Sequence, residues 1–261
     1  MALAHSQSIR VRPSETNQHG CLRTDATANY MEDIATEHAA LLGVGLEVLL
    51  EHNISWAMSK MRISFNRRPQ SGEPLTLSTR PLAGHRHTYL REFFFTDNDG
   101  QVCITAMTWW VVFDLTTRKM SALPEALDHF PQNEEPVLES AVNIPAIKRF
   151  ADPLPGPEFT IRQADIDQNN HVNNVRYVSF VEEAGFLFNP KAALQQIELI
   201  FRAESKYRDI ISTTSALETE SPPSASPAYS LASYSLVHSL HTATGELLRG
   251  RTLWGIKPTS S

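Results

Sequence analysis

The chain has 261 residues, of which 41% are hydrophobic and 20% charged, so its composition is that of a globular protein and excludes a disordered one. Its longest apolar runs, such as 109–113, are too short to cross a bilayer, and its first residues show no secretory signal. The two cysteines, Cys21 and Cys103, exclude a disulfide scaffold and a cysteine-based zinc site, and they favour a reducing, cytoplasmic location.

The net charge of -6 argues against a general nucleic-acid binder. The charge is unevenly distributed, because residues 55–91 contain seven basic residues and one acidic residue, Glu73. Two interpretations stay open. The basic residues form a docking surface for an acidic partner, or they are arginines scattered over solvated strand faces.

A helix is predicted first, over 28–42, because its apolar residues recur at steps of three and four. Four strand-like segments follow, and glycines separate them. They are 55–65, 75–82, 88–96 and 102–113. Between the last two, the sequence Asn-Asp-Gly at 98–100 predicts a hairpin turn.

A proline-rich stretch comes next, with seven of the 16 prolines between 124 and 157. Proline fixes φ and removes a backbone donor, so this density predicts a semi-rigid connection. We therefore expect an N-terminal domain over 1–135, a linker over 136–157 and a C-terminal domain over 158–261. A shorter low-complexity patch at 221–228 predicts a loop.

The second part repeats the order of the first. A helix is predicted over 174–188, and four strands follow it. The strands are 194–203, 212–218, 229–238 and 246–256. A helix followed by about four antiparallel strands thus occurs twice, and neither half is large enough for an extensive core alone. The fold class expected is α+β, a tandem hot-dog in which each antiparallel sheet wraps around one long helix.

The densest polar signal, residues 165–174, lies directly before the second helix and reads DIDQNNHVNN. Its first residues resemble a calcium loop. However, Asn170 stands where that loop needs glycine, and Arg176 where it needs glutamate. Neither a metal nor an organic cofactor is required by the sequence.

Asp167, Asn169 and His171 follow one another at spacings of two, which suggests that their side chains converge. A histidine exchanges protons near neutral pH, an amide can position a carbonyl or a water, and a carboxylate can orient the histidine. The alternative is an Asx-rich loop that only caps the helix.

The string D-x-N-x-H-V-N-N-V-x-Y at 167–177 resembles the acyl-(acyl carrier protein) thioesterases of plants and bacteria. The stretches 56–63, 72–81 and 108–120 are also similar to that family, so the resemblance covers most of the chain. It implies a double hot-dog, with the family's active-site Asp, Asn and His at Asp167, Asn169 and His171. It also implies that the catalytic carboxylate, expected on a strand, is Glu204.

This sequence has Ser205 where many plant members of that family have cysteine, which argues against a cysteine nucleophile. The hypothesis is therefore direct hydrolysis of an acyl thioester. Glu204, together with His171, activates water, Asn169 places the water or the thioester, Asp167 orients the loop, and helix-terminal amides stabilise the oxyanion. Free fatty acid and acyl carrier protein are the expected products, made in fatty acid biosynthesis.

The first half lacks such a set in its corresponding loop, taken as 24–30, so it is expected to hold the acyl chain. Arg62, Arg67 and Arg68 are the candidates for docking the carrier protein. No nucleic acid and no membrane insertion are expected, and association of two chains is left open.

Three alternatives remain. A hot-dog acyl-CoA thioesterase would use the same hydrolysis on another carrier. A hot-dog hydratase is disfavoured, because its loop carries a proline and places the histidine five residues after the aspartate, whereas His171 comes four residues after Asp167. A non-catalytic acyl-binding module would require the set of Asp167, Asn169, His171 and Glu204 to be accidental.

Overall fold

The computed structural model describes residues 4–85, 87–127, 138, 144–150, 152–168, 170–218 and 233–256. The chain forms two compact units. The first comprises Met1–Met61 and Arg68–Asn143, and the second comprises Arg62–Arg67 and Ile144–Ser261. Within the described ranges, none of the helices has the length and hydropathy needed to cross a bilayer.

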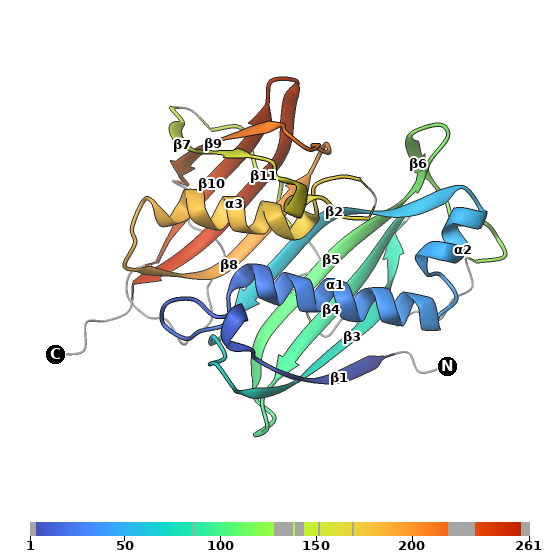
Figure 1. The fold of residues 1–261 in the computed structure, drawn as a ribbon, viewed down its shortest axis with the longest axis horizontal. Coiled ribbons are helices and arrows are strands. Elements are labelled where there is room, and N and C mark those ends of the chain that lie inside the picture. Colours follow the sequence, from blue (N-terminus) through green and yellow to red (C-terminus); the bar gives the residue numbers. More distant parts are fainter. Residues whose placement is uncertain are drawn as a thin grey trace. The chain divides into compact units, whose positions relative to one another are not determined.

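The first unit is an antiparallel sheet with one long helix across it (Figure 1). Its elements are β1 His5–Arg10, η1 Pro13–Glu15, α1 Thr24–Leu41, α2 Leu46–Glu51, β2 Ile54–Phe65, β3 Pro74–His85, β4 Thr88–Thr96, β5 Val102–Asp114 and β6 Lys119–Ser121. The strand order is β1-β3-β4-β5-β2, and β6 pairs with β5. The predicted turn at 98–100 joins β4 to β5, where Gly100 has a φ of 78° and the Asp97 amide donates to Gln101.

The interior of the first unit is mainly apolar, but it encloses one cation. Met31 and Ile34 of α1 are buried, as is Phe93 of β4. Arg91, also buried, donates to His38 of α1 at 3.0 Å and to Thr79 at 3.2 Å. Desolvation by burial lowers the pKa of the Arg91 guanidinium to about 10. These contacts place α1 over the face of the sheet to which Arg91 points.

The second unit repeats this design (Figure 1). Its elements are β7 Leu154–Thr160, η3 Gln163–Asp165, α3 Asn174–Phe186, β8 Ala192–Phe201, β9 Ile210–Leu217, β10 Ser233–Thr242 and β11 Gly245–Ile256. The strand order is β8-β11-β10-β9-β7. A Cβ atom at Gly185 of α3 would lie 2.5 Å from the Trp254 ring, so the glycine lets α3 approach β11 closely.

The predicted helices and strands are present with differences in their ends, whereas the strands β1, β6 and β7 and the short helix α2 were not predicted. The helix predicted from residue 28 begins at Thr24, and the one predicted to residue 188 ends at Phe186. β7 begins at Leu154, inside the predicted linker, because prolines are tolerated in a strand at the edge of a sheet. The patch at 221–228 lies outside the described residues.

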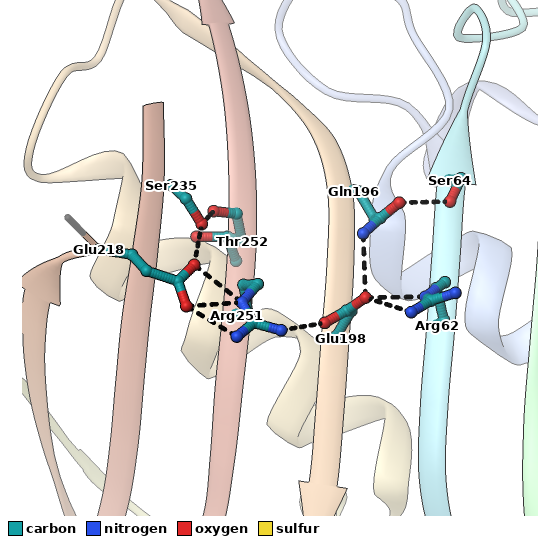
Figure 2. A network of polar contacts seen from close by, with 8 residues as sticks. All are labelled: Arg62, Ser64, Gln196, Glu198, Glu218, Ser235, Arg251 and Thr252. Carbon is teal, nitrogen blue, oxygen red and sulfur yellow. Dashed lines mark hydrogen bonds and ion pairs between the residues drawn. The ribbon is translucent and has the colours of Figure 1, made fainter. Parts of the chain in front are cut away.

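A chain of ion pairs crosses the face of the second sheet opposite α3 (Figure 2). Glu198 accepts from Arg62 Nε at 2.8 Å and from Arg251 Nη1 at 2.9 Å, and Arg251 also binds Glu218. Gln196 and Ser235 add hydrogen bonds at the two sides. Since Arg62 lies on β2, this network fastens the end of that strand to the second unit.

Candidate active site

The polar loop before α3 is a tight turn whose backbone is fixed by its own residues. The Asp167 amide donates to the His171 carbonyl at 2.9 Å, and the Asn170 amide to the Asp167 carbonyl at 3.0 Å. Asn170 has a φ of 62°, which asparagine tolerates better than most residues. The Asp167 carboxylate accepts the His171 amide at 3.3 Å. Asp167 therefore shapes the loop on which His171 stands.

Ser205 connects this loop to the segment that follows β8. Its carbonyl accepts the Val172 amide at 3.1 Å, and its buried hydroxyl lies 2.8 Å from the Tyr177 hydroxyl. Burial is the main cause that raises the pKa of the Tyr177 phenol. Because His171 precedes Val172 and Glu204 precedes Ser205, the backbone bond brings these two side chains together.

The pair that results joins a histidine and a carboxylate. His171 Nε2 lies 3.2 Å from Glu204 Oε2, and the two side chains are 25% and 46% exposed, so both are accessible to solvent. Glu204 was expected on a strand, but it lies beyond the end of β8 at Phe201. Asn169, the remaining predicted site residue, lies outside the described residues.

The start of α3 is capped by its own loop. Asn173 accepts the Val175 amide at 2.7 Å, as the sequence-based alternative of a capping loop also expects. The Asn173 amide in turn donates to the Asp165 carbonyl. Asp165 is buried, and its hydrogen bonds from Arg162 are the main cause that lowers the pKa of the Asp165 carboxyl. The loop therefore caps α3 and also carries His171 of the His171–Glu204 pair, so the two interpretations of the loop are compatible.

The first unit contains the same turn with different side chains. There the bridge pairs Thr16 with Leu22, the Asn17 amide donates to Cys21, and the Leu22 amide donates to Pro69. Cys21 therefore stands in the place of His171. The prediction that 24–30 is the corresponding loop was wrong, because those residues already belong to α1.

The residue that corresponds to Glu204 is Arg68. It precedes Pro69 as Glu204 precedes Ser205, and it donates to the Leu22 carbonyl and the Thr24 hydroxyl. A histidine and a carboxylate are thus replaced by a thiol and a guanidinium. Among the described residues, the acid–base pair of this turn is present in the second unit alone.

Comparison with known proteins decides the family. The model of the acyl-ACP thioesterase N-terminal domain matches residues 2–129, and that of the C-terminal domain matches residues 155–254. This chain belongs to the acyl-ACP thioesterase family. The resemblance seen in the sequence is therefore confirmed.

Two curated relatives illustrate the family. The chain is 26% identical over 273 residues to a chloroplastic palmitoyl-acyl carrier protein thioesterase of Gossypium hirsutum, covering 99% of this chain and 65% of the relative. It is 25% identical over 283 residues to oleoyl-acyl carrier protein thioesterase 1 of Arabidopsis thaliana, also chloroplastic, covering 99% of this chain and 78% of the relative. The chain thus spans less than two thirds of the length of the first relative.

Solved structures of the family share the fold. The 12:0-ACP thioesterase from Umbellularia californica matches with a TM-score of 0.81 and 20% identity, over 98% of this chain and 99% of that one. An acyl-ACP thioesterase from Bacteroides thetaiotaomicron matches with a TM-score of 0.80 and 20% identity, over 96% and 97% of the two chains. The predicted tandem hot-dog is confirmed.

Ser205 marks a difference from many plant members of the acyl-ACP thioesterase family, which have cysteine at this position. In this chain the Ser205 side chain is buried and bonded to Tyr177. It holds the loop in place and is not presented to a substrate as a nucleophile.

Two of the three cations predicted to dock a carrier protein, Arg62 and Arg68, bind other groups of this chain. The Arg62 side chain is 10% exposed and paired with Glu198, which counts against a role in docking a partner. Arg68 donates to Leu22 and Thr24, and Arg67 is only partly exposed. The excess charge of 55–91 is reduced because two of its arginines pair with Glu92 and Glu198, which lie outside that window.

One group of side chains in the first unit has the composition of a metal site. Ligand atoms of Glu73, Asp97 and Cys103 lie within 4.8 Å of one another. However, Asp97 accepts the amides of Gln101 and Asp99, and Glu73 accepts that of Gln70. We assign both carboxylates to turn formation.

Proposed function

We propose that this protein hydrolyses the thioester of a fatty acyl group carried by acyl carrier protein. A water oxygen bonds to the thioester carbonyl carbon, the carbon–sulfur bond breaks, and the carrier thiol takes a proton as the fatty acid leaves. The observation that carries the proposal is the 3.2 Å contact between His171 Nε2 and Glu204 Oε2 at an accessible position. A base and its partner within hydrogen-bond reach are what activation of water requires.

In this proposal Glu204 and His171 act as one acid–base pair. The pair takes the proton of the attacking water and returns it to the sulfur, which removes the need for a covalent acyl-enzyme. The buried position of Ser205 supports this route. The N-terminus of α3 follows His171 in the chain after Val172 and Asn173. It carries the partial positive charge that stabilises a developing oxyanion. Asn169 places the water or the thioester.

We assign the acyl chain to the first unit. Its copy of the turn has Cys21 and Arg68 in place of the acid–base pair, so it lacks the residues for hydrolysis. Its interior under α1 buries large apolar side chains, as an acyl chain requires.

The test is steady-state release of the carrier thiol from acyl-ACP by the Glu204→Gln and His171→Ala proteins. We expect each kcat to fall by about 10²-fold or more, the usual contribution of a positioned acid or base. Glu183→Ala, which removes an exposed carboxylate from α3, is the matched control and should turn over at the normal rate. Near-normal turnover by both site variants would exclude this assignment.

An acyl-CoA thioesterase would use the same pair, so the carrier decides between the two activities. Equal acyl chains on acyl carrier protein and on coenzyme A should give a clearly higher kcat/KM for the protein carrier. A non-catalytic acyl-binding module predicts no thiol release from either substrate. The His171–Glu204 contact counts against that module, because binding an acyl chain does not need it.

A further inference from the structure

The segment that carries Glu204 forms a fixed surface between β8 and β9. Arg202, Glu204, Lys206 and Arg208 are exposed, while Ser205 is buried among them. The backbone is held at several points, since Ser205 accepts the Val172 amide and Arg208 donates its own amide to Ile161. The backbone positions of Lys206 and Arg208 relative to that of Glu204 are therefore set by the fold.

Lys206 and Arg208 differ from the paired arginines of this protein. Arg62, Arg80, Arg249 and Arg251 are paired with carboxylates, and Arg202 lies 3.2 Å from Glu246. In the part of the chain that the structure describes, neither Lys206 nor Arg208 forms an ion pair. The nearby Asp209 carboxylate accepts the Lys206 backbone amide at 2.8 Å.

Within the described residues, the side chain of Arg208 contacts an aromatic ring instead of a carboxylate. Its guanidinium carbon lies 5.1 Å from the centre of the Tyr207 ring, and Tyr207 is 47% exposed. Stacking on the ring fixes the guanidinium plane and leaves its N–H groups for a carboxylate partner. Because Lys206 is two residues from Glu204, and a residue spans at most about 3.5 Å, the Cα atoms of these two residues lie within roughly 7 Å of each other.

Resting on the proposed function, we propose that Lys206 and Arg208 dock the acidic surface of the carrier protein beside Glu204. The protein as a whole carries a net charge of -6, so an acidic partner is repelled at long range and needs a local positive surface to bind. Two exposed cations that form no ion pair with any described residue, close in the chain to Glu204, supply that surface. They take the place of Arg62, which is buried and paired.

The test compares three thioesters of one acyl chain: on acyl carrier protein, on coenzyme A, and on N-acetylcysteamine. The Lys206→Glu/Arg208→Glu protein should show a KM for acyl-ACP raised by roughly tenfold, because reversing charges at the rim of an interface slows association. Its kcat/KM for the other two substrates should stay within about twofold of normal. The normal protein's KM for acyl-ACP should rise with salt, and the variant's should rise less.

The matched control is Lys148→Glu/Arg149→Glu. Both residues are exposed, and they follow Ile147, which binds Arg249 on the sheet face opposite α3. The control makes the same charge change and should leave the KM for acyl-ACP within about twofold of normal.

Three results would overturn the docking proposal. One is an unchanged KM for acyl-ACP in the Lys206/Arg208 variant. Another is an equal loss on acyl-ACP and acyl-CoA but not on N-acetylcysteamine, which would show that the cations bind phosphate. The third is an equal loss on all three substrates, which would show that the segment only supports Glu204. Failure of the proposed function is distinct, because the normal protein would then release no thiol from any thioester.

Discussion

The hydroxyl of Tyr177 lies 2.8 Å from the hydroxyl of Ser205, and this bond joins the first turn of α3 to the segment that carries Glu204. The two residues are 28 positions apart in the chain and both are buried. The same segment binds the loop that carries His171 through the Val172 amide. The geometry of the His171–Glu204 pair thus depends on the hydroxyl contact between Tyr177 and Ser205, although neither hydroxyl belongs to the pair.

Removing either hydroxyl leaves the other buried without its partner, so Tyr177→Phe and Ser205→Ala should each lower the free energy of unfolding by about 1–2 kcal/mol. The double variant should lose little more than either single one, because the buried polar groups go together. Urea unfolding of the three proteins measures this. Strictly additive losses would contradict it.

Tyr177→Phe should also affect turnover more than binding. A loosened Ser205 segment shifts Glu204 relative to His171, so kcat should fall severalfold while KM for acyl-ACP stays near normal. The measurement is the separate determination of kcat and KM. A raised KM with normal kcat would instead give Tyr177 a role in substrate binding.

Arg62→Met should destabilise the protein by about 3–5 kcal/mol, because it removes one partner of a buried ion pair and leaves Glu198 with less positive charge. Arg62→Met/Glu198→Gln should recover part of that loss, since the glutamine is neutral. Denaturant midpoints compare the proteins. An Arg62→Met protein of normal stability would show that the buried pair contributes no net free energy.

Stability should depend on pH through His238. Its nitrogens lie 2.8 Å from the Ser215 hydroxyl and 2.7 Å from the Thr252 hydroxyl, and burial lowers its pKa from 6.5 to about 3. A lowered folded-state pKa means that unfolding takes up a proton below pH 6.5. The contribution of His238 is therefore complete above that pH and declines toward pH 3, by about 1.4 kcal/mol per pH unit.

Urea unfolding at pH 7.5, 6 and 5 tests this dependence by comparing normal and His238→Gln proteins. Carboxylates titrate in both proteins, so the informative quantity is the difference between their free energies of unfolding. That difference should shrink or reverse as the pH falls. A difference that is constant over this range would remove His238 as a source of acid sensitivity.

Cys21→Ser should leave kcat on acyl-ACP unchanged. Cys21 is partly exposed and Cys103 is buried, both are free, and the proposed hydrolysis uses neither thiol. Alkylation of the native protein with iodoacetamide should likewise leave thiol release intact. A Cys21→Ser protein without activity would require a thiol nucleophile and contradict direct attack by water.

Local sequence patterns predicted the parts that depend on neighbouring residues. The apolar spacing of α1 and α3 and the Asn-Asp-Gly turn are local signals, and the Asp167–His171 loop folds through bonds among its own residues. β7 escaped prediction because its three residues Pro155, Gly156 and Pro157 are typical of turns, and an edge position made them acceptable.

Contacts between distant segments account for the rest. Arg62 appeared to be a surface cation because its partner Glu198 comes 136 residues later. Likewise, the contact between Tyr177 and Ser205 gave no signal in the sequence, since it depends on how the segment after β8 lies beside the turn before α3. Glu204 was assigned to the site from the resemblance to a family, because the residues around it in the sequence do not by themselves identify it as part of the site.

The ion pair at Arg62 also bears on which residues a fragment containing the second unit must include. A fragment starting at Ile144 would inherit Glu198 but forfeit one of its two guanidinium partners, because that arginine is encoded far upstream. Such a fragment would keep the Glu198–Arg251 pair but lose the 2.6 Å contact with Arg62, so residues 62–67 are needed to complete the ion pairs of the second unit.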